Sequence, residues 1–250
     1  MVDGQIIVVG WPLAGVLVLL TVVGALVVRL GRLDGWRPVV TAATRATVQL
    51  GTVSLLIAAV LASGWLTAGF VLLMYGIAAV TSAGRITRGG GRAAVRALPG
   101  PAMSIAAGVG PVLALLVGTG IVPARPVAII PIAGILIGGA MTATSLAGRR
   151  ARDELRARRG EYEAALALGL FNRDAALLIT RPTANQALVP VLDQTRTVGL
   201  VTLPGAFVGV LLGGGDPIQA GVTQLVVLVS LLAIEAVAVL VTIEVVAHTP

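Results

Sequence analysis

Residues 218–246 read IQAGVTQLVVLVSLLAIEAVAVLVTIEVV, and this run decides the fold class. Its only charged side chains are Glu235 and Glu244, and most of the others are aliphatic. A helix that crosses a lipid bilayer needs about 20 predominantly apolar residues, because the hydrocarbon core is about 30 Å thick. We therefore predict a transmembrane helix over residues 218–246.

The composition of the whole chain has the same character. Among its 250 residues, 57% are hydrophobic and 12% are charged, and the mean hydropathy is +0.99. A soluble domain carries about 25% charged residues. The composition therefore excludes a soluble enzyme and a disordered chain. The 32 glycines follow no triplet period, which excludes a collagen-like chain.

Other apolar runs reach the length of a span, and we predict seven transmembrane helices in one all-α, polytopic membrane domain over residues 1–250. The first run has Asp3 before it and arginines after it, the reverse of a signal peptide, which favours a retained span. The sixth run has an alternative start near Ala187. The predicted spans cover residues 5–28, 46–62, 65–83, 101–122, 127–148, 197–213 and 218–246.

The basic residues predict the orientation. All 18 are arginine, and all but Arg125 follow the first, third or fifth span. Connections rich in Arg are cytoplasmic under the positive-inside rule. We therefore expect a plasma-membrane protein with its N-terminus outside and its C-terminus in the cytoplasm. The same rule attributes the net charge of +7 to contact with the lipid bilayer and not to nucleic-acid binding. These arginines are Arg29, Arg32, Arg37, Arg45, Arg85, Arg88, Arg92, Arg96, Arg149, Arg150, Arg152, Arg156, Arg158, Arg159, Arg173, Arg181 and Arg196.

The missing residue types exclude several chemistries. The chain has no cysteine and no lysine. Because a P-loop needs a lysine on the phosphates, any ATP must be bound by another chain. The single histidine, His248, lies outside the predicted spans, which excludes a serine–histidine pair within the membrane. We expect no catalytic residue, no cofactor and no resident metal site.

The longest cytoplasmic connection, residues 149–196, is predicted to be largely helical. A first helix over residues 151–159 is interrupted by Gly160, and a second one places Tyr162, Ala165, Leu166 and Gly169 on a narrow apolar stripe open to a partner. A third short helix over residues 175–180 is ended by a proline. We also expect an ion pair between Asp193 and Arg196, three residues apart.

This connection carries a spaced pattern: E-A-A, then three residues and Gly, then nine residues, Ile and, three positions on, Pro. It comprises Glu163, Ala164, Ala165, Gly169, Ile179 and Pro182. The pattern resembles the EAA loop of ABC-transporter membrane subunits, with Arg181 where that pattern has Leu. The resemblance implies that the connection is a coupling loop. In such subunits a short coupling helix docks on a cytoplasmic ATP-binding subunit and passes its motion to the membrane.

Further runs resemble one permease family, the seven-span subunits of iron or metal export ABC transporters, to which plant aluminium-tolerance membrane subunits are similar. The matching runs are RATVQL at residues 45–50, IPIAG at 130–134, ALVP at 187–190 and TRTVGLVTLPG at 195–205. The resemblance implies a homodimeric permease that moves a small solute. Iron or another metal ion is the candidate solute, export the direction, and a separate subunit hydrolyses ATP.

One departure from the family bears on the solute. Where the family has Met-Met after Pro204-Gly205, this chain has Ala206 and Phe207. Thioethers are soft metal ligands, and the chain lacks them here. We therefore expect no metal ligands in the spans.

Polar and small residues in the spans are candidates for a translocation path. An ionisable group inside a membrane is a functional candidate by default. The alternatives are a protonated Glu235 bonded to a neighbouring helix, glutamines that join helices, and small residues that serve ordinary packing. The candidates are Gln49, Pro131, Gly134, Pro204, Gly205, Gln224 and Glu235.

A second functional class stays open, an ATP-independent secondary transporter or channel. That class would be indicated by charge pairs within the membrane or by inverted repeats, and the sequence shows neither clearly. A neighbouring gene for a P-loop subunit would separate the two classes.

Overall fold

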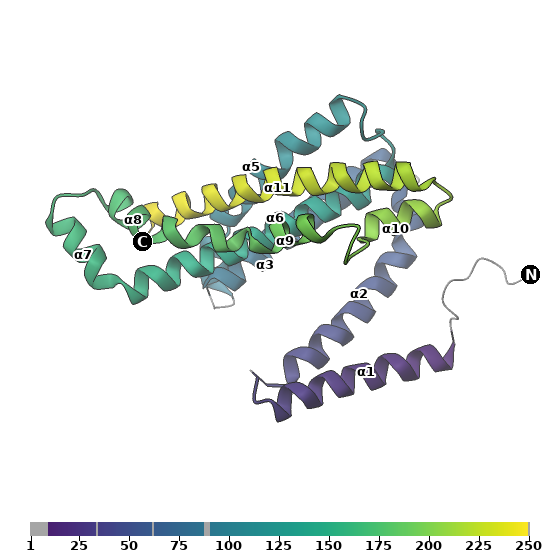
Figure 1. Ribbon diagram of the computed structural model, residues 1–250, viewed down its shortest axis with the longest axis horizontal. Coiled ribbons are helices and arrows are strands. Elements are labelled where there is room, and N and C mark those ends of the chain that lie inside the picture. Colours follow the sequence, from purple (N-terminus) through teal and green to yellow (C-terminus); the bar gives the residue numbers. More distant parts are fainter. Residues whose placement is uncertain (1–9, 34, 62, 88–90, 250) are drawn as a thin grey trace, which may run out of the picture. The chain divides into compact units, whose positions relative to one another are not determined.

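The computed structural model describes residues 10–33, 35–61, 63–87 and 91–249, and these residues are almost wholly helical (Figure 1). Residues 5–9 of the first predicted span, Ala62 of the second, and Arg88 lie outside the described residues. The helices are α1 (Trp11–Leu30), α2 (Arg37–Leu61), α3 (Gly64–Thr87), α4 (Arg92–Ala97), α5 (Pro99–Gly118), α6 (Pro126–Ala157), α7 (Arg159–Ala167), α8 (Asn172–Ala184), a 3-10 turn η1 (Asn185–Ala187), α9 (Val189–Thr197), α10 (Gly205–Leu212) and α11 (Pro217–His248).

Six of the described helices are long and apolar enough to cross a membrane, namely α1, α2, α3, α5, α6 and α11. This confirms an all-α, polytopic membrane protein. With 32 residues each, α6 and α11 are about 48 Å long at 1.5 Å per residue. They therefore extend well past a hydrocarbon core of about 30 Å.

The sixth predicted span, residues 197–213, is not one continuous helix, and this corrects the prediction. Helix α9 ends at Thr197, α10 begins at Gly205, and a turn lies between them. Gly199 has φ +82°, a left-handed conformation that interrupts a right-handed helix. Leu203 precedes Pro204, which disfavours helical geometry at Leu203 and keeps Pro204 outside α10 as its N-cap.

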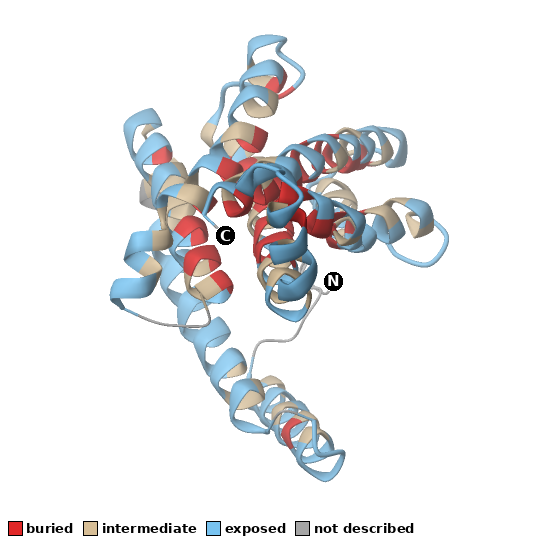
Figure 2. Cartoon of the chain, turned by 90° about the vertical axis from the view of Figure 1, so that its left-hand side faces the viewer, coloured by how far each residue is buried: buried red, intermediate tan, exposed pale blue. Residues whose placement is uncertain are grey.

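The described chain divides into two compact units, residues 1–60 and 61–250. In the first, α1 and α2 are apolar and exposed almost throughout, with Ala25 the one buried residue of α1 (Figure 2). Such helices suit lipid surroundings. That both units form one domain over residues 1–250 stays a prediction.

The core of the second unit lies where α3, α5, α6 and α11 pack together. Ile105 of α5, Leu136 of α6 and Ile234 of α11 are fully buried there. Figure 2 shows the buried residues gathered where these helices meet. Helix α11 contacts α5, α6, α8, α9 and α10, so it is the central element of the unit.

Small residues let these helices approach closely. A Cβ atom added at Gly108 of α5 would lie 2.7 Å from the backbone oxygen of Ile234. One added at Gly139 of α6 would lie 2.5 Å from Cδ2 of Leu231. The predicted small residue Gly134 packs in the same way, since its added Cβ would lie 2.8 Å from Cε of Met74. Packing of α6 against α3 and α11, and of α5 against α11, therefore depends on glycine.

We predict that Gly108→Ala lowers the melting temperature of the detergent-purified protein. The added methyl group meets backbone and not a flexible side chain, and such overpacking costs about 1–3 kcal/mol. Gly110→Ala on the same helix is the matched control, because open space surrounds Gly110. An unchanged melting temperature for Gly108→Ala would contradict the close contact of α5 with α11.

Candidate functional site

The first candidate site is the loop that follows α6. Helix α6 continues to Ala157, and Arg158, with φ −109° and ψ 33°, separates it from α7. The break therefore lies at Arg158, and the predicted interruption at Gly160 is wrong, since Gly160 lies within α7. Arg158 Nε donates to Glu161 Oε1 at 2.9 Å. This hydrogen bond lowers the pKa of Glu161 and raises that of Arg158, so the pair is ionised at neutral pH.

Helix α7 holds the E-A-A residues. Glu163 and Ala164 are exposed, and Glu163 accepts a hydrogen bond from Arg159 Nε at 2.8 Å. Ala165 is buried, and Tyr162 packs against the apolar cluster that α6, α8 and α11 form. Tyr162 and Ala165 of the predicted apolar stripe therefore face the protein itself, whereas Gly169 at its end is exposed.

A glycine turn ends α7 and reverses the chain. Gly169 has φ +92°, its N–H donates to the Leu166 carbonyl at 2.9 Å, and the Leu170 N–H donates to the Ala165 carbonyl at 3.1 Å. This is a Schellman ending, which favours glycine at the left-handed position. Beside the turn, Leu168 and Phe171 are 84% and 80% exposed. These two apolar side chains form the outer tip of the loop, and the sequence pattern had not singled them out.

Helix α8 follows the turn and contains the last two residues of the pattern. Ile179 is buried and Pro182 is exposed. The helix continues through Pro182 to Ala184, so the prediction that the proline ends it is wrong. Proline removes one N–H donor, and the chain then tightens into the 3-10 turn η1.

An ionic cluster fastens α8 to the end of α11. Arg173 of α8 donates to both carboxylate oxygens of Glu244, through Nε and one Nη, at 2.9 Å each. Arg181, two turns further along α8, lies 3.5 Å from the same carboxylate. Bidentate arginine–carboxylate pairs fix geometry as well as charge. The only sequence signal for this contact is a lone acid near the end of an apolar helix.

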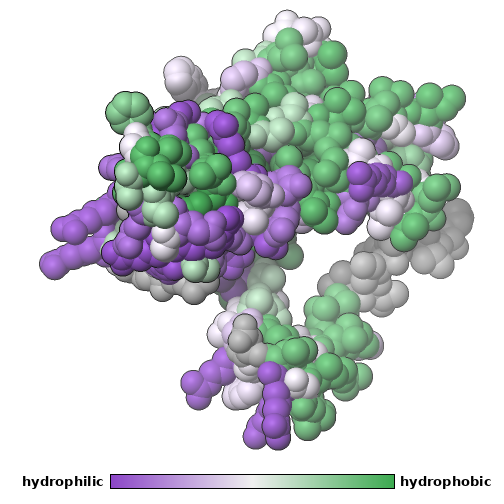
Figure 3. Space-filling view, turned by 60° about the vertical axis from the view of Figure 1, so that its left-hand side comes forward, coloured by the Kyte–Doolittle hydropathy of each residue, from purple (hydrophilic) through white to green (hydrophobic). Residues whose placement is uncertain are grey.

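Apolar packing supports the same attachment. Ala176 and Leu177 of α8 are buried together with Ala143 of α6 and with Val239 and Ile243 of α11. Figure 1 shows α7 and α8 at one end of α6 and α11. In Figure 3 hydrophilic side chains gather at that end, and much of the rest of the second unit is hydrophobic. The loop is therefore a fixed extension of the two long helices.

The second candidate site is a groove between α6, α10 and α11. Its volume is about 610 Å³, its lining is mainly apolar, and it brings together Pro131 and Gly205. Gln219 and Thr223 add polar groups. Pro204 caps α10 next to the groove. Two predicted path residues thus share one hollow.

The remaining path residues lie elsewhere. Gln224 is buried on α11, and its Oε1 accepts from the backbone N–H of Phe207 at 3.3 Å, which ties α10 to α11. Glu235 is buried with its carboxylate facing Gly139 of α6, where an added Cβ would lie 2.7 Å from its Oε1. Gln49 is exposed on α2 in the first unit.

The remaining predictions concern one ion pair and the metal ligands. The predicted pair of Asp193 and Arg196 is confirmed, with 3.7 Å between its charged atoms. Among the described residues no group of three or more His, Asp or Glu side chains could hold a metal ion.

Long apolar helices and a polar end define a multi-pass, all-helical membrane protein. Comparison with known proteins places it more closely: the chain belongs to the uncharacterised protein family (UPF0014), which matches residues 11–249. No solved structure matches the chain.

Curated relatives come from plants and bacteria. The chain is 37% identical over 187 residues to "UPF0014 membrane protein STAR2" of Oryza sativa subsp. japonica, which covers 75% of this chain and 65% of that protein. It is 37% identical to "Protein ALUMINUM SENSITIVE 3" of Arabidopsis thaliana over 66% of this chain and 59% of the relative. It is 34% identical to "Probable iron export permease protein FetB" of Escherichia coli (strain K12) over 52% and 51%. The chain thus spans about half to two thirds of the length of these relatives.

We predict that Glu244→Gln loosens α8. The variant removes the charge that both arginines share, and because the carboxylate is one quarter exposed the loss is about 1 kcal/mol, or about fivefold in local opening. Hydrogen exchange measured by mass spectrometry over residues 172–184 should accelerate by that factor. Asp193→Asn, which breaks an exposed pair away from α8, is the control. Unchanged exchange in Glu244→Gln would show that apolar packing alone holds α8.

Proposed function

We propose that the chain is the membrane permease subunit of an ABC transporter, with ATP hydrolysis on a separate cytoplasmic subunit. The observation that carries the proposal is the loop of α7, the Gly169 turn and α8. It projects from the membrane helices, ends in exposed Leu168 and Phe171, and is clamped to α11 through Glu244. Exposed apolar side chains on a rigid tip suit insertion into a cleft of a partner.

Glu163, Ala164, Ala165, Gly169, Ile179 and Pro182 take different parts in this proposal. Ala165 and Ile179, both buried, hold α7 and α8 to the rest of the loop. Gly169 sets the turn, and Glu163, Ala164 and Pro182 lie on the exposed side. A push on the tip would therefore move α7 and α8 together.

The groove at Pro131 and Gly205 is the proposed translocation path, together with Gly134, Pro204, Gln224 and Glu235. Gln49 of the first unit stays a candidate that the sequence alone suggests. The solute is small. Iron or another metal ion moving outward is the candidate that the name of the E. coli relative supports. The mainly apolar lining of the groove indicates passage and not tight metal binding.

We further propose a homodimer in the plasma membrane, with the N-terminus outside and the C-terminus in the cytoplasm. The turn between α9 and α10 supports the dimer. Both helices contact α11, so the turn lies along its length, and yet Leu200 and Val201 are 92% and 77% exposed. Irregular backbone at membrane depth requires cover by protein. A second copy would provide it.

We predict that Gly169→Val uncouples transport from ATP hydrolysis. A β-branched residue at φ +92° is strained by at least about 1–2 kcal/mol, which alters the ending of α7 while the membrane helices stay intact. The chain should be co-purified with candidate ATP-binding subunits and tested for ATPase activity. The ATPase activity that is coupled to transport should fall about five- to thirtyfold.

The matched control is Gly160→Ala, which changes a helical glycine of α7 that has open space around it. It should retain the wild-type activity. Wild-type coupling in Gly169→Val, or failure of the native chain to form a complex with any ATP-binding subunit, would overturn the assignment and favour an ATP-independent transporter.

Cross-linking tests the dimer. Because the chain has no cysteine, only an introduced cysteine can react. Leu200→Cys in membranes should give a covalent dimer with a short bifunctional maleimide, because the turn lies at the proposed contact. Leu115→Cys, 62% exposed on α5, is the comparison variant. A dimer band of equal strength from both variants, or none from Leu200→Cys, would refute this contact.

A further inference from the structure

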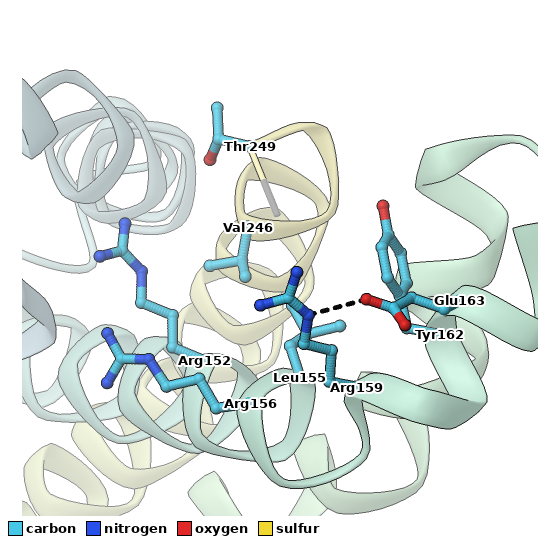
Figure 4. A pocket seen from close by; sticks show the side chains of 8 residues that line it. All are labelled: Arg152, Leu155, Arg156, Arg159, Tyr162, Glu163, Val246 and Thr249. Atoms are coloured by element: carbon cyan, nitrogen blue, oxygen red, sulfur yellow. Dashed lines mark hydrogen bonds and ion pairs between the residues drawn. The ribbon is translucent and has the colours of Figure 1, made fainter.

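A basic cavity lies beside the loop, between the end of α6, α7 and the end of α11. Its volume is about 490 Å³. Arg152 and Arg156 of α6 and Arg159 of α7 line it, together with Leu155, Val246 and Thr249. Figure 4 shows Arg152 and Arg156 on the same side of α6, below the end of α11 at Val246 and Thr249. A smaller cavity of about 230 Å³ shares Arg152 and adds Arg96.

The charges in this cavity are not balanced. Among the described residues that line it, the only acidic group is Glu163, and Arg159 Nε donates a hydrogen bond to that carboxylate at 2.8 Å (Figure 4). Arg152 and Arg156, one turn apart, have no ion pair with an acidic side chain among the described residues. Like charges four residues apart on a helix repel each other. An anion placed between them would relieve this repulsion.

The position of the cavity matches that of lipid headgroups. The predicted span of α6 ends at residue 148, and Arg152 lies four residues further, about 6 Å along the helix axis. The headgroup layer extends about 5–7 Å beyond the hydrocarbon core on each side. Apolar Leu155 and Val246 line the same hollow, which suits a ligand with a charged and an apolar part.

We propose that Arg152 and Arg156 form a binding site for a phosphate group, supplied by the headgroup of an anionic lipid or by a soluble phosphate. Guanidinium groups bind phosphate oxygens through paired hydrogen bonds. Basic pockets between membrane helices on the cytoplasmic side bind anionic headgroups in the same way. The site adjoins α7, so its occupant would also steady the base of the loop. This inference does not depend on coupling to ATP.

The test measures the melting temperature of the full chain in a neutral detergent at fixed salt. The added probes are phosphatidylglycerol, phosphatidylcholine and inorganic phosphate. We expect phosphatidylglycerol to raise the melting temperature of the wild type by several degrees and phosphatidylcholine to leave it unchanged. The double variant Arg152→Gln/Arg156→Gln should lose most of that rise. A rise with inorganic phosphate that needs the same arginines would identify a soluble phosphate as the ligand.

The matched control is Arg29→Gln/Arg149→Gln, which removes the same charge from exposed positions outside the cavity and should respond as the wild type does. Arg152→Lys/Arg156→Lys, which keeps the charge but loses the paired geometry, should respond weakly and replaces the glutamine variant if that variant does not fold. An equal response of all variants would overturn the proposal. Binding of the ATP-binding subunit should also be measured by co-purification. If Arg152→Gln/Arg156→Gln responds to phosphatidylglycerol as the wild type does but no longer binds that subunit, the proposal is overturned and the cavity is assigned to that partner.

Discussion

Backbone hydrogen bonding in a solvent without water constrains every other feature of this chain. In lipid each N–H and C=O must find a partner inside the protein, and long helices meet that requirement by themselves. The segment between α9 and α10 meets it only in part. There the N–H groups of Leu200, Val201 and Thr202 donate to the Thr197 carbonyl, and that of Gly199 donates to the Thr202 carbonyl at 2.9 Å. The carbonyls of residues 199–201 accept no backbone hydrogen bond among the described residues. The same constraint that makes the long helices therefore calls for protein cover at this turn.

Apolar length predicts a span, but it does not predict whether the backbone stays helical. This explains why the sequence predicts the six long helices correctly, whereas the predicted span over residues 197–213 is not one continuous helix. Proline alone is no guide, since Pro111, Pro131 and Pro182 lie inside α5, α6 and α8. The break at residues 198–204 combines a left-handed Gly199 with Pro204 a few residues on. Both residues can be read from the sequence, but the left-handed φ angle of Gly199, which ends the helix before Pro204, cannot.

In the candidate site too, some features could be predicted from the sequence and others could not. Gly169 could be singled out by its spacing after the E-A-A residues, and glycine is favoured where a helix ends in a left-handed turn. The contact of Glu244 with Arg173 could not, because it joins residues 71 positions apart. The apolar stripe at Tyr162 and Ala165 was located correctly, but its covering was not. Periodicity indicates which face of a helix is apolar, whereas only tertiary packing decides whether the chain itself or a partner covers that face.

Two uninterrupted helices join the loop to the groove, and this gives the proposed coupling a physical route. Helix α6 lines the groove at Pro131 and reaches its last residue just before α7, and α11 lines the groove near its start and bears Glu244 near its end. Close packing at Gly139 prevents the two from sliding freely past each other. A displacement of α7 and α8 is then passed on as a joint movement of α6 and α11. The groove wall formed by α10 is short and flanked by the turn at Gly199, so it is the part of the groove most able to yield.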